Sequence, residues 1–242
     1  KSVNQGGVSK MAEPSKEDWQ ALLDKLRQRG TPAPAAAAVE PAGGPNPCTA
    51  CEPKQLEACG VYSRYQQASF AAIEARGIPA ELQQPVAVVR EYAEKLPAHL
   101  AAGEGLVLRG PVGTLKTTLA VAVLQYCLQL GERAMFLTMP SLIDSIFSAK
   151  AVSSEDWLRF ESRLRQVPLL VLDDLGAEWG SGYVTSKIDA IFAERYNRKK
   201  STIVTTNLAG QDLRSRYPER IIDRLRETTQ VITFNTETSL RR

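Results

Sequence analysis

The stretch Gly110-Pro111-Val112-Gly113-Thr114-Leu115-Lys116-Thr117 lies between a predicted strand and a predicted helix, and it decides the fold. Backbone N–H groups at a helix N-terminus point at phosphate groups, and the helix dipole favours anions there. This context predicts a phosphate-binding loop of the Walker A type. The residues that we expect to contact the nucleotide are Gly110, Pro111, Val112, Gly113, Thr114, Leu115, Lys116, Thr117 and Thr118.

Two side chains of this loop have specific expected roles. Lys116 is expected to reach the β- and γ-phosphates of ATP, and the hydroxyl of Thr117 to hold Mg²⁺. The usual pattern is G-x-x-x-x-G-K-S/T, but Leu115 stands where the last glycine is expected. Glycine serves there because the backbone comes close to the phosphates and leaves no room for a Cβ atom. The loop alone therefore leaves two alternatives open, a working site and one that Leu115 has impaired.

A second motif follows further along the chain, where the apolar run 167–172 ends in Asp173 and Asp174. In nucleotide-hydrolysing proteins the first carboxylate reaches the Mg²⁺ shell, and the second orients or deprotonates the attacking water. Asp173 and Asp174 take these roles in that order. The alternative is that both aspartates merely end a strand and cap a turn. Asn207, after the next strand, is expected to contact the γ-phosphate or the water, or else to be an ordinary turn residue.

The chain around these motifs alternates between strands and helices, which predicts an α/β fold with a parallel five-stranded sheet covered by helices on both sides. An almost unbroken apolar run such as 167–172 is typical of a strand buried on both faces. The expected strands are 106–108, 134–138, 167–172, 202–205 and 231–234. The expected helices of this region are 117–130, 141–148, 184–198 and 221–225, after helical segments within 62–99.

Size and composition agree with a globular protein. The 242 residues are 43% hydrophobic, which is enough to bury a core, and the net charge of +3 is too small to indicate a nucleic-acid partner. There is neither an apolar run of about 18 residues nor a signal peptide, and four cysteines do not make a disulfide framework at this size. We therefore expect a cytoplasmic protein.

The N-terminal quarter has a different character. Residues 1–10 precede the first methionine and are interpreted as an expression leader, and 11–30 contain an amphipathic helix that packs on its own core or docks on a partner. The Ala/Pro/Gly-rich stretch 31–47 is a predicted flexible linker. A cysteine-bearing segment, 48–60, leads into the main domain, 61–242.

Three cysteines of that segment resemble half of a zinc site. Cys48, Cys51 and Cys59 supply three ligands, whereas structural zinc takes four. Water, an acidic residue or a second subunit would have to complete the site. Cys127, within the helix after the phosphate loop, is expected to be a small core residue.

Four stretches carry a resemblance to a known family. They are GPVGTLKTTLA (110–120), LLVLDDLG (169–176), AIFAERYNRKKSTIVTTNL (190–208) and PERIIDRL (218–225). In this order, within residues 61–234, they resemble the bacterial DnaC/DnaI/IstB family of AAA+ ATPases, which contains helicase loaders and ATPase helpers of transposition. The resemblance implies an AAA+ P-loop NTPase core without a C-terminal helical lid.

The resemblance also implies a function. A protein of this kind couples binding and hydrolysis of ATP, with release of ADP, to oligomerisation, binding of single-stranded DNA and delivery of a replicative helicase. One alternative is a transposition helper, and another is a nucleotide-binding adaptor that lost hydrolysis through Leu115. Arg224 would be the arginine finger that reaches a neighbouring subunit's nucleotide, with Arg220 as second choice. The alternative is that both form surface ion pairs with Glu219 and Asp223.

Basic residues concentrate in the C-terminal half, and this clustering suits contact with a nucleic-acid backbone. The alternative is a solvated face on which they alternate with acidic residues. The basic residues concerned are Arg195, Arg198, Lys199, Lys200, Arg214, Arg216, Arg220, Arg224 and Arg226.

Overall fold

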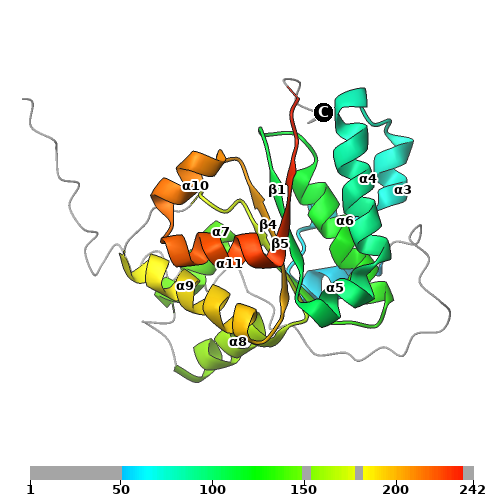
Figure 1. Ribbon diagram of the computed structural model, residues 1–242. Coiled ribbons are helices and arrows are strands. Elements are labelled where there is room, and N and C mark those ends of the chain that lie inside the picture. Colours follow the sequence, from blue (N-terminus) through cyan, green and yellow to red (C-terminus); the bar gives the residue numbers. More distant parts are fainter. Residues whose placement is uncertain (1–50, 149–153, 178–181, 237–242) are drawn as a thin grey trace, which may run out of the picture. The chain divides into compact units, whose positions relative to one another are not determined.

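Five parallel strands form the centre of the structure, a computed structural model that describes residues 51–148, 154–177 and 182–236 (Figure 1). The strands are β1 (Gly105–Arg109), β2 (Ala134–Thr138), β3 (Leu169–Asp173), β4 (Ser201–Thr206) and β5 (Thr229–Thr233). Their order in the sheet is β2-β3-β4-β1-β5, and every pair of neighbours runs parallel. The predicted five-stranded parallel sheet is thus confirmed.

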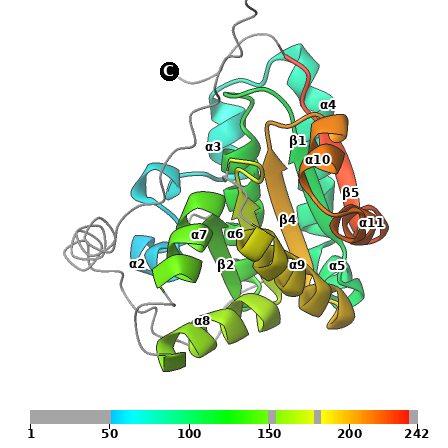
Figure 2. The same ribbon diagram turned by 90° about the vertical axis from the view of Figure 1, so that its left-hand side faces the viewer.

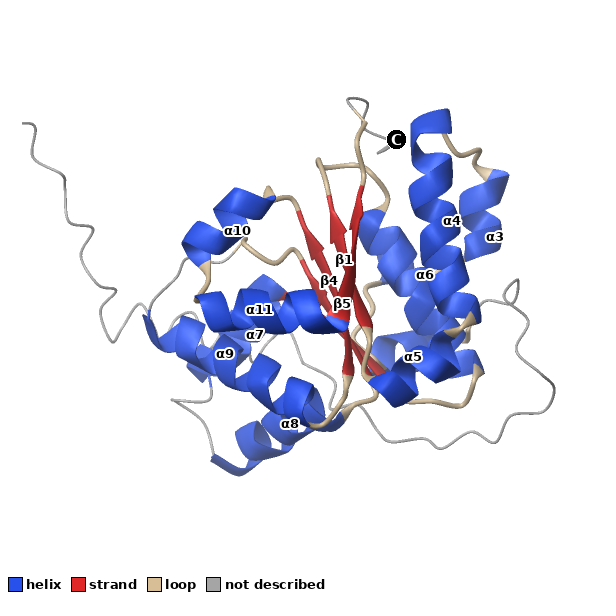
Figure 3. Ribbon diagram, in the orientation of Figure 1, coloured by secondary structure: helices blue, strands red, loops and turns tan. Residues whose placement is uncertain are grey.

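Helices cover both faces of this sheet, as Figures 1 and 3 show. One face carries the segments from α2 to α6, and the other carries α7 to α11. The first group is α2 (Pro53–Ala58), the 3₁₀ helix η1 (Ser63–Tyr65), α3 (Phe70–Ala75), α4 (Ala80–Glu94), α5 (Leu96–Ala102) and α6 (Lys116–Gln129). The second group is α7 (Met139–Ser148), α8 (Ser154–Gln166), α9 (Gly182–Asn197), α10 (Gly210–Arg216) and α11 (Glu219–Thr228).

The apolar strands explain this layering. Successive side chains of a strand point to opposite faces, so an apolar run supplies two cores at once. In β3, Val171 packs into the core beneath α6, whereas Leu170 and Leu172 pack into the core beneath α7 and α9. All three side chains are buried. Each face of the sheet therefore needs a helical cover.

Three helices lie outside the elements that the sequence predicts: the short α2, and also α8 and α10. In α8 the apolar residues Trp157, Phe160 and Leu164 recur at helical spacing, but charged residues dominate the segment. In α10 the buried residue is Leu213, so the helix has almost no apolar period. Local pattern is weak in both segments, and packing against α9 and α11 defines them.

The predictions for the N-terminus fall largely outside the described residues. This applies to the helix expected within 11–30, to the linker 31–47 and to Cys48. Within the described chain, α2 packs on the core beneath α6 through Leu56. No helix of the described residues is long and apolar enough to cross a membrane.

The sheet gathers the candidate site at one edge, which Figure 2 shows from a second side. Parallel strands bring their carboxyl ends to the same edge, where ligands bind in α/β folds. Leu172 pairs in register with Val204, and Arg109 pairs with Thr206. Residues that directly follow these positions, Asp173 among them, therefore lie side by side.

Candidate functional site

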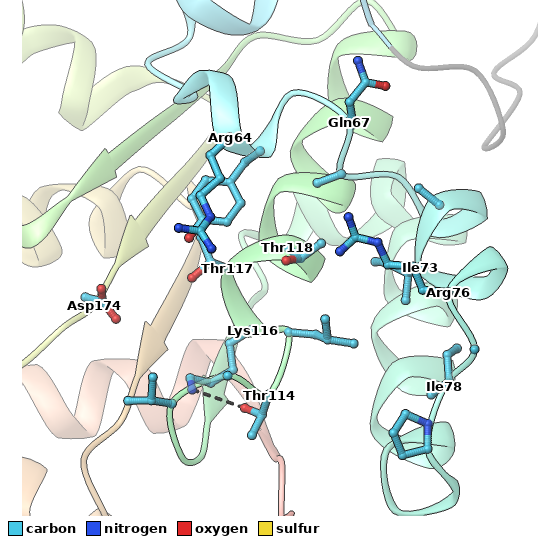
Figure 4. Close-up of a pocket in the computed structure, with 18 of the residues that line it drawn as sticks. Arg64, Gln67, Ile73, Arg76, Ile78, Thr114, Lys116, Thr117, Thr118 and Asp174 are labelled. Carbon is cyan, nitrogen blue, oxygen red and sulfur yellow. Dashed lines mark hydrogen bonds between the residues drawn. The ribbon is translucent and has the colours of Figure 1, made fainter. Parts of the chain in front are cut away.

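A pocket of about 830 Å³ opens where the loop after β1 meets the segment from η1 to α4 (Figure 4). One wall is lined by residues within 64–79, and the other by 112–118 together with Asp174 and Asn207. The lining residues are Arg64, Tyr65, Gln67, Ala68, Ala72, Ile73, Arg76, Gly77, Ile78, Pro79, Val112, Gly113, Thr114, Leu115, Lys116, Thr117, Thr118, Asp174 and Asn207. Seven residues of the expected loop, 112–118, are among them.

The loop has the backbone of a phosphate-binding loop despite its missing glycine. Leu115 is the N-cap of α6 and adopts the left-handed conformation, with φ 66° and ψ 5°. A left-handed residue other than glycine costs about 1–2 kcal/mol, which is the physical reason for glycine at this position. The Leu115 side chain is partly buried against the core beneath α6. Leucine is therefore accommodated here at the cost of local strain.

Gly110 is required by a close approach of the backbone. A Cβ atom on this residue would lie 2.3 Å from the carbonyl oxygen of Phe234, and its φ is +156°. Gly113 also has a positive φ, 86°. Gly110 and Pro111, both expected to contact the nucleotide, do not line the pocket.

The Lys116 side chain is folded back onto its own loop. Its ammonium nitrogen donates to the carbonyl oxygens of Gly110 (2.8 Å) and Pro111 (2.6 Å) and lies 3.3 Å from the hydroxyl of Thr114. The side chain is buried, so these bonds replace water around the charge. Figure 4 shows Lys116 and Thr114 together at the bottom of the loop. Contact with a phosphate requires the ammonium to exchange these carbonyls for phosphate oxygens.

Asp173 joins the end of β3 to the start of α6. Its Oδ1 accepts hydrogen bonds from the hydroxyls of Thr117 (2.9 Å) and Thr205 (2.6 Å). Burial raises the pKa of the Asp173 carboxyl, the nearby Asp174 charge raises it further, and the two hydroxyls and Lys116 oppose these effects. The sequence pairs Thr117 with Asp173 as metal ligands, and the structure brings the two together.

The residues around Asp173 fit a magnesium ion. Mg²⁺ prefers oxygen ligands at 2.0–2.1 Å in an octahedron, so two adjacent ligands lie about 3 Å apart. The oxygens of Thr117 and Asp173 are 2.9 Å apart, which matches this spacing. Thr117 and Asp173 are thus the residues that would hold the ion.

Asp174 and Asn207 lie at the pocket, as the sequence predicts. Asp174 is left-handed, with φ 58°, and its backbone N–H donates to the Thr205 hydroxyl at 3.0 Å. The Asp174 side chain lines the pocket, whereas Asp173 is buried and is not among the lining residues. Two consecutive carboxylates therefore face different surroundings.

The two candidate arginine fingers share one carboxylate. Arg220 Nε lies 2.7 Å from Asp189 Oδ2, and Arg224 Nη1 lies 2.9 Å from Oδ1 of the same residue, on α9. The alternative prediction, that both arginines form ion pairs with Glu219 and Asp223, is wrong, because α11 turns both arginines toward α9. The Arg220 side chain is 61% exposed, compared with 28% for Arg224.

The basic cluster of the C-terminal half is largely engaged within the described structure. Arg195 is 1% exposed and therefore not a surface contact for nucleic acid, contrary to the sequence-based expectation. Arg198 pairs with Glu194 at 2.9 Å, and Arg226 pairs with Asp223 at 3.3 Å. Binding of single-stranded DNA by this cluster stays a prediction that the remaining basic residues would have to carry.

The cysteines lie at the core beneath α6. The Cys51 thiol donates to the carbonyl oxygen of Gln125 at 3.4 Å, and burial raises its pKa to about 11 and also raises the pKa of the Cys59 thiol. Cys127 is buried, as predicted. The part of the chain that the structure describes contains no group of three His, Cys, Asp or Glu side chains able to hold a metal. Because Cys48 lies outside it, zinc binding stays a prediction.

The second wall of the pocket is what sequence reasoning missed. It comes from η1, α3 and the turn that follows, with Arg64, Ile73, Arg76 and Ile78 among its residues. Neither arginine belongs to a motif, and the segment has only the helical pattern expected within 62–99. The one feature of the sequence that points to this wall is the resemblance to the DnaC/DnaI/IstB family, which covers residues 61–234.

This chain is similar to known proteins in sequence and in fold. The replicative helicase loader DnaC of Buchnera aphidicola from Acyrthosiphon pisum is 30% identical over 140 residues, 57% of this chain and 55% of that protein. A putative ATP-binding protein of insertion sequence IS21 from Pseudomonas aeruginosa is 29% identical over 138 residues, 56% of this chain and 49% of that protein. The chain thus spans about half the length of these two relatives.

A crystal structure of the DnaC helicase loader superimposes with a TM-score of 0.58 at 30% identity, over 65% of this chain and 92% of that one. The family of IstB-like ATP binding proteins matches residues 93–242, more than half of the chain and all of the loop, Asp173, Asp174 and Asn207. The chain therefore belongs to the IstB-like ATP-binding family, with an AAA+ P-loop NTPase fold.

Proposed function

We propose that this protein binds and hydrolyses Mg²⁺–ATP in the pocket and uses the nucleotide cycle to deliver a replicative helicase onto single-stranded DNA. The observation that carries the proposal is that the phosphate loop and Asp174 line one pocket, with Asp173 hydrogen-bonded to the lining residue Thr117. Two relatives support it, since one is named a helicase loader and the other an ATP-binding protein. A cytoplasmic location fits this function.

Binding begins at the loop. The backbone N–H groups at the start of α6 donate to the phosphates, and the helix dipole adds to the attraction. Lys116 leaves the carbonyls of Gly110 and Pro111 and neutralises phosphate charge. Thr117 and Asp173 would hold the magnesium ion, which would draw charge from the phosphate oxygens.

Hydrolysis requires a water in line with the bond to be broken. The water oxygen forms a bond to the γ-phosphorus while the bond between this phosphorus and the β,γ-bridging oxygen breaks, which yields ADP and inorganic phosphate. Asp174 accepts the proton of the water, and the amide of Asn207 orients the water molecule. Both side chains line the pocket on the carboxyl edge of the sheet.

Self-association completes the site in this proposal. Arg224, with Arg220 as second choice, reaches the γ-phosphate held by a neighbouring subunit and stabilises the charge that develops there. To do so an arginine has to leave Asp189, which is 15% exposed and holds both in the single chain. The helix within 11–30, joined by the linker 31–47, would dock on the helicase, while the domain 61–242 would bind nucleotide and DNA.

The delivery step is tested by capture on immobilised protein in the presence of ATP. The ligands are the purified replicative helicase of the source organism, the transposase of an IS21-type element, and a fluorescent single-stranded oligonucleotide. We expect retention of helicase and oligonucleotide with ATP, and loss of the oligonucleotide in Lys116→Ala. Retention of the transposase alone would instead support the transposition helper, and retention of none of the three would contradict delivery.

Leu115→Gly is expected to raise ATP affinity severalfold and to change the unfolding free energy by less than about 1 kcal/mol. Glycine removes a Cβ atom beside the phosphates and relieves the left-handed strain, whereas loss of the partly buried side chain offsets the gain in stability. Binding isotherms for ATP and urea unfolding measure the two effects.

Leu115→Ala is the matched control, because it shortens the side chain but keeps the Cβ atom. We expect it to leave ATP affinity close to the wild-type value. Weaker ATP binding by Leu115→Gly would mean that the leucine side chain itself contacts the nucleotide. Turnover confined to Leu115→Gly would identify the natural protein as a nucleotide-binding adaptor.

A further inference from the structure

We propose that Arg64 and Arg76 bind the nucleotide from the wall opposite the phosphate loop, and that Arg64 distinguishes ATP from ADP. Arg64 would contact the terminal phosphate within the same chain, and Arg76 the part that ATP and ADP share. The inference rests on the proposed use of the pocket for nucleotide. It assigns ligand-binding roles to a segment that lies before the region matched by the family.

The charges that line the pocket favour a polyanion. The lining contains three cationic side chains, those of Arg64, Arg76 and Lys116, and one carboxylate, that of Asp174. Among the described residues, neither arginine forms an ion pair. Glu74, two residues before Arg76, is instead paired with Arg90 of α4. The two guanidinium groups are therefore available to a ligand, and guanidinium binds phosphate through paired N–H donors.

The geometry separates the roles of the two arginines. Figure 4 shows the Arg64 side chain reaching from η1 toward Thr117, whereas the Arg76 side chain points from the end of α3 toward Thr118. Thr117 marks the terminal-phosphate end, because its hydroxyl is bonded to Asp173 of the magnesium site. The pocket continues past Thr118 to the apolar Ile73 and Ile78, which suit a base. Arg64 is thus at the end that differs between ATP and ADP.

A buried glutamine fixes this wall to the loop's own helix. Gln125 of α6 is 1% exposed, and its amide nitrogen donates to the backbone carbonyls of Gln66 (3.0 Å) and Ala68 (2.8 Å). Its amide oxygen accepts from the backbone N–H of Cys51 at 3.1 Å. The segment that carries Arg64 is therefore held against the same helix whose first turn carries Thr117 and Thr118. These hydrogen bonds fix the distance between the η1–α3 wall and the phosphate loop, and a ligand binds between the two.

The test measures dissociation constants of ATP and ADP, each with Mg²⁺, for Arg64→Gln and Arg76→Gln. We expect Arg64→Gln to weaken ATP binding about tenfold or more and to change ADP binding less than about twofold, since one charge-assisted contact is lost. Arg76→Gln should weaken both nucleotides to a similar extent. Arg198→Gln, at an exposed arginine just after the end of α9 and outside the pocket, is the matched control and should change neither.

Both arginines are exposed, so the unfolding midpoint should stay at the wild-type value and separate binding from folding. If Arg64→Gln weakens ATP and ADP binding equally, or leaves ATP binding unchanged, the assignment of Arg64 is overturned. The proposed nucleotide site still stands in that case, provided that the wild-type protein binds ATP. No effect of Arg76→Gln would overturn the assignment of Arg76. A wild-type protein that binds neither nucleotide would overturn the proposed function as well.

Discussion

Asp174→Asn is expected to lower ATP turnover by about a hundredfold or more while leaving ATP binding close to the wild-type value. A general base contributes about 10²–10⁴ in rate, and an amide cannot accept the proton of the attacking water. Asparagine has the same shape and tolerates the left-handed backbone that Asp174 adopts, with φ 58°. The measurements are steady-state phosphate release and an ATP binding isotherm on the same preparation.

The neighbouring carboxylate is the matched control. Asp173→Asn should weaken Mg²⁺-dependent binding of ATP, because Asp173 lies with the Thr117 hydroxyl at the expected ion site. The two variants thus separate a loss of chemistry from a loss of binding. Undiminished turnover in Asp174→Asn would show that another group activates the water and would leave Asp174 as a turn residue.

The same variant tests the finger in a neighbouring subunit. An Asp174→Asn subunit still has Arg224, and an Arg224→Ala subunit still has an intact pocket. Where the arginine of the first subunit reaches the pocket of the second, one complete site forms. We expect mixing to restore part of the turnover that each variant lacks alone. Absence of restoration, with both variants folded, would exclude Arg224 as a finger, and Arg220→Ala would then be tested in the same way.

Arg195→Met is expected to lower the free energy of unfolding by about 3 kcal/mol. The guanidinium of Arg195 donates to the Thr202 hydroxyl (2.9 Å) and to the backbone carbonyls of Leu164 (2.7 Å) and Val167 (3.0 Å). Each buried acceptor left without a donor costs about 1–3 kcal/mol, and removal of a buried charge offsets part of the sum. Burial lowers the pKa of Arg195 to about 9, so the group remains charged at neutral pH.

Urea unfolding of Arg195→Met and of Arg198→Met measures this prediction. Arg198 lies directly after the last residue of α9, where its side chain is 52% exposed, and its replacement should cost less than about 0.5 kcal/mol. ATP binding per folded molecule should be unchanged in both variants. A loss below about 1 kcal/mol in Arg195→Met would mean that water replaces the guanidinium between α8, α9 and β4.

The sequence by itself determined the sheet, the phosphate loop and the two carboxylates. Each of these features depends on residues close together in the chain. The apolar run 167–172 predicts a strand buried on both faces, and the loop at 110–117 has meaning only between a strand and a helix. The order of the two motifs along the chain also predicts that Thr117 and Asp173 act on the same ion.

Only the tertiary structure decided which charged side chains are engaged and with what. Arg195 and Arg198 stand in one basic run, yet one is buried and the other paired on the surface, since the packing of α8 against α9 covers only the first. Arg220 and Arg224 pair with Asp189, which is distant in the chain. Periodicity encodes which face of an element is apolar, but a charge finds its partner through the arrangement of whole elements.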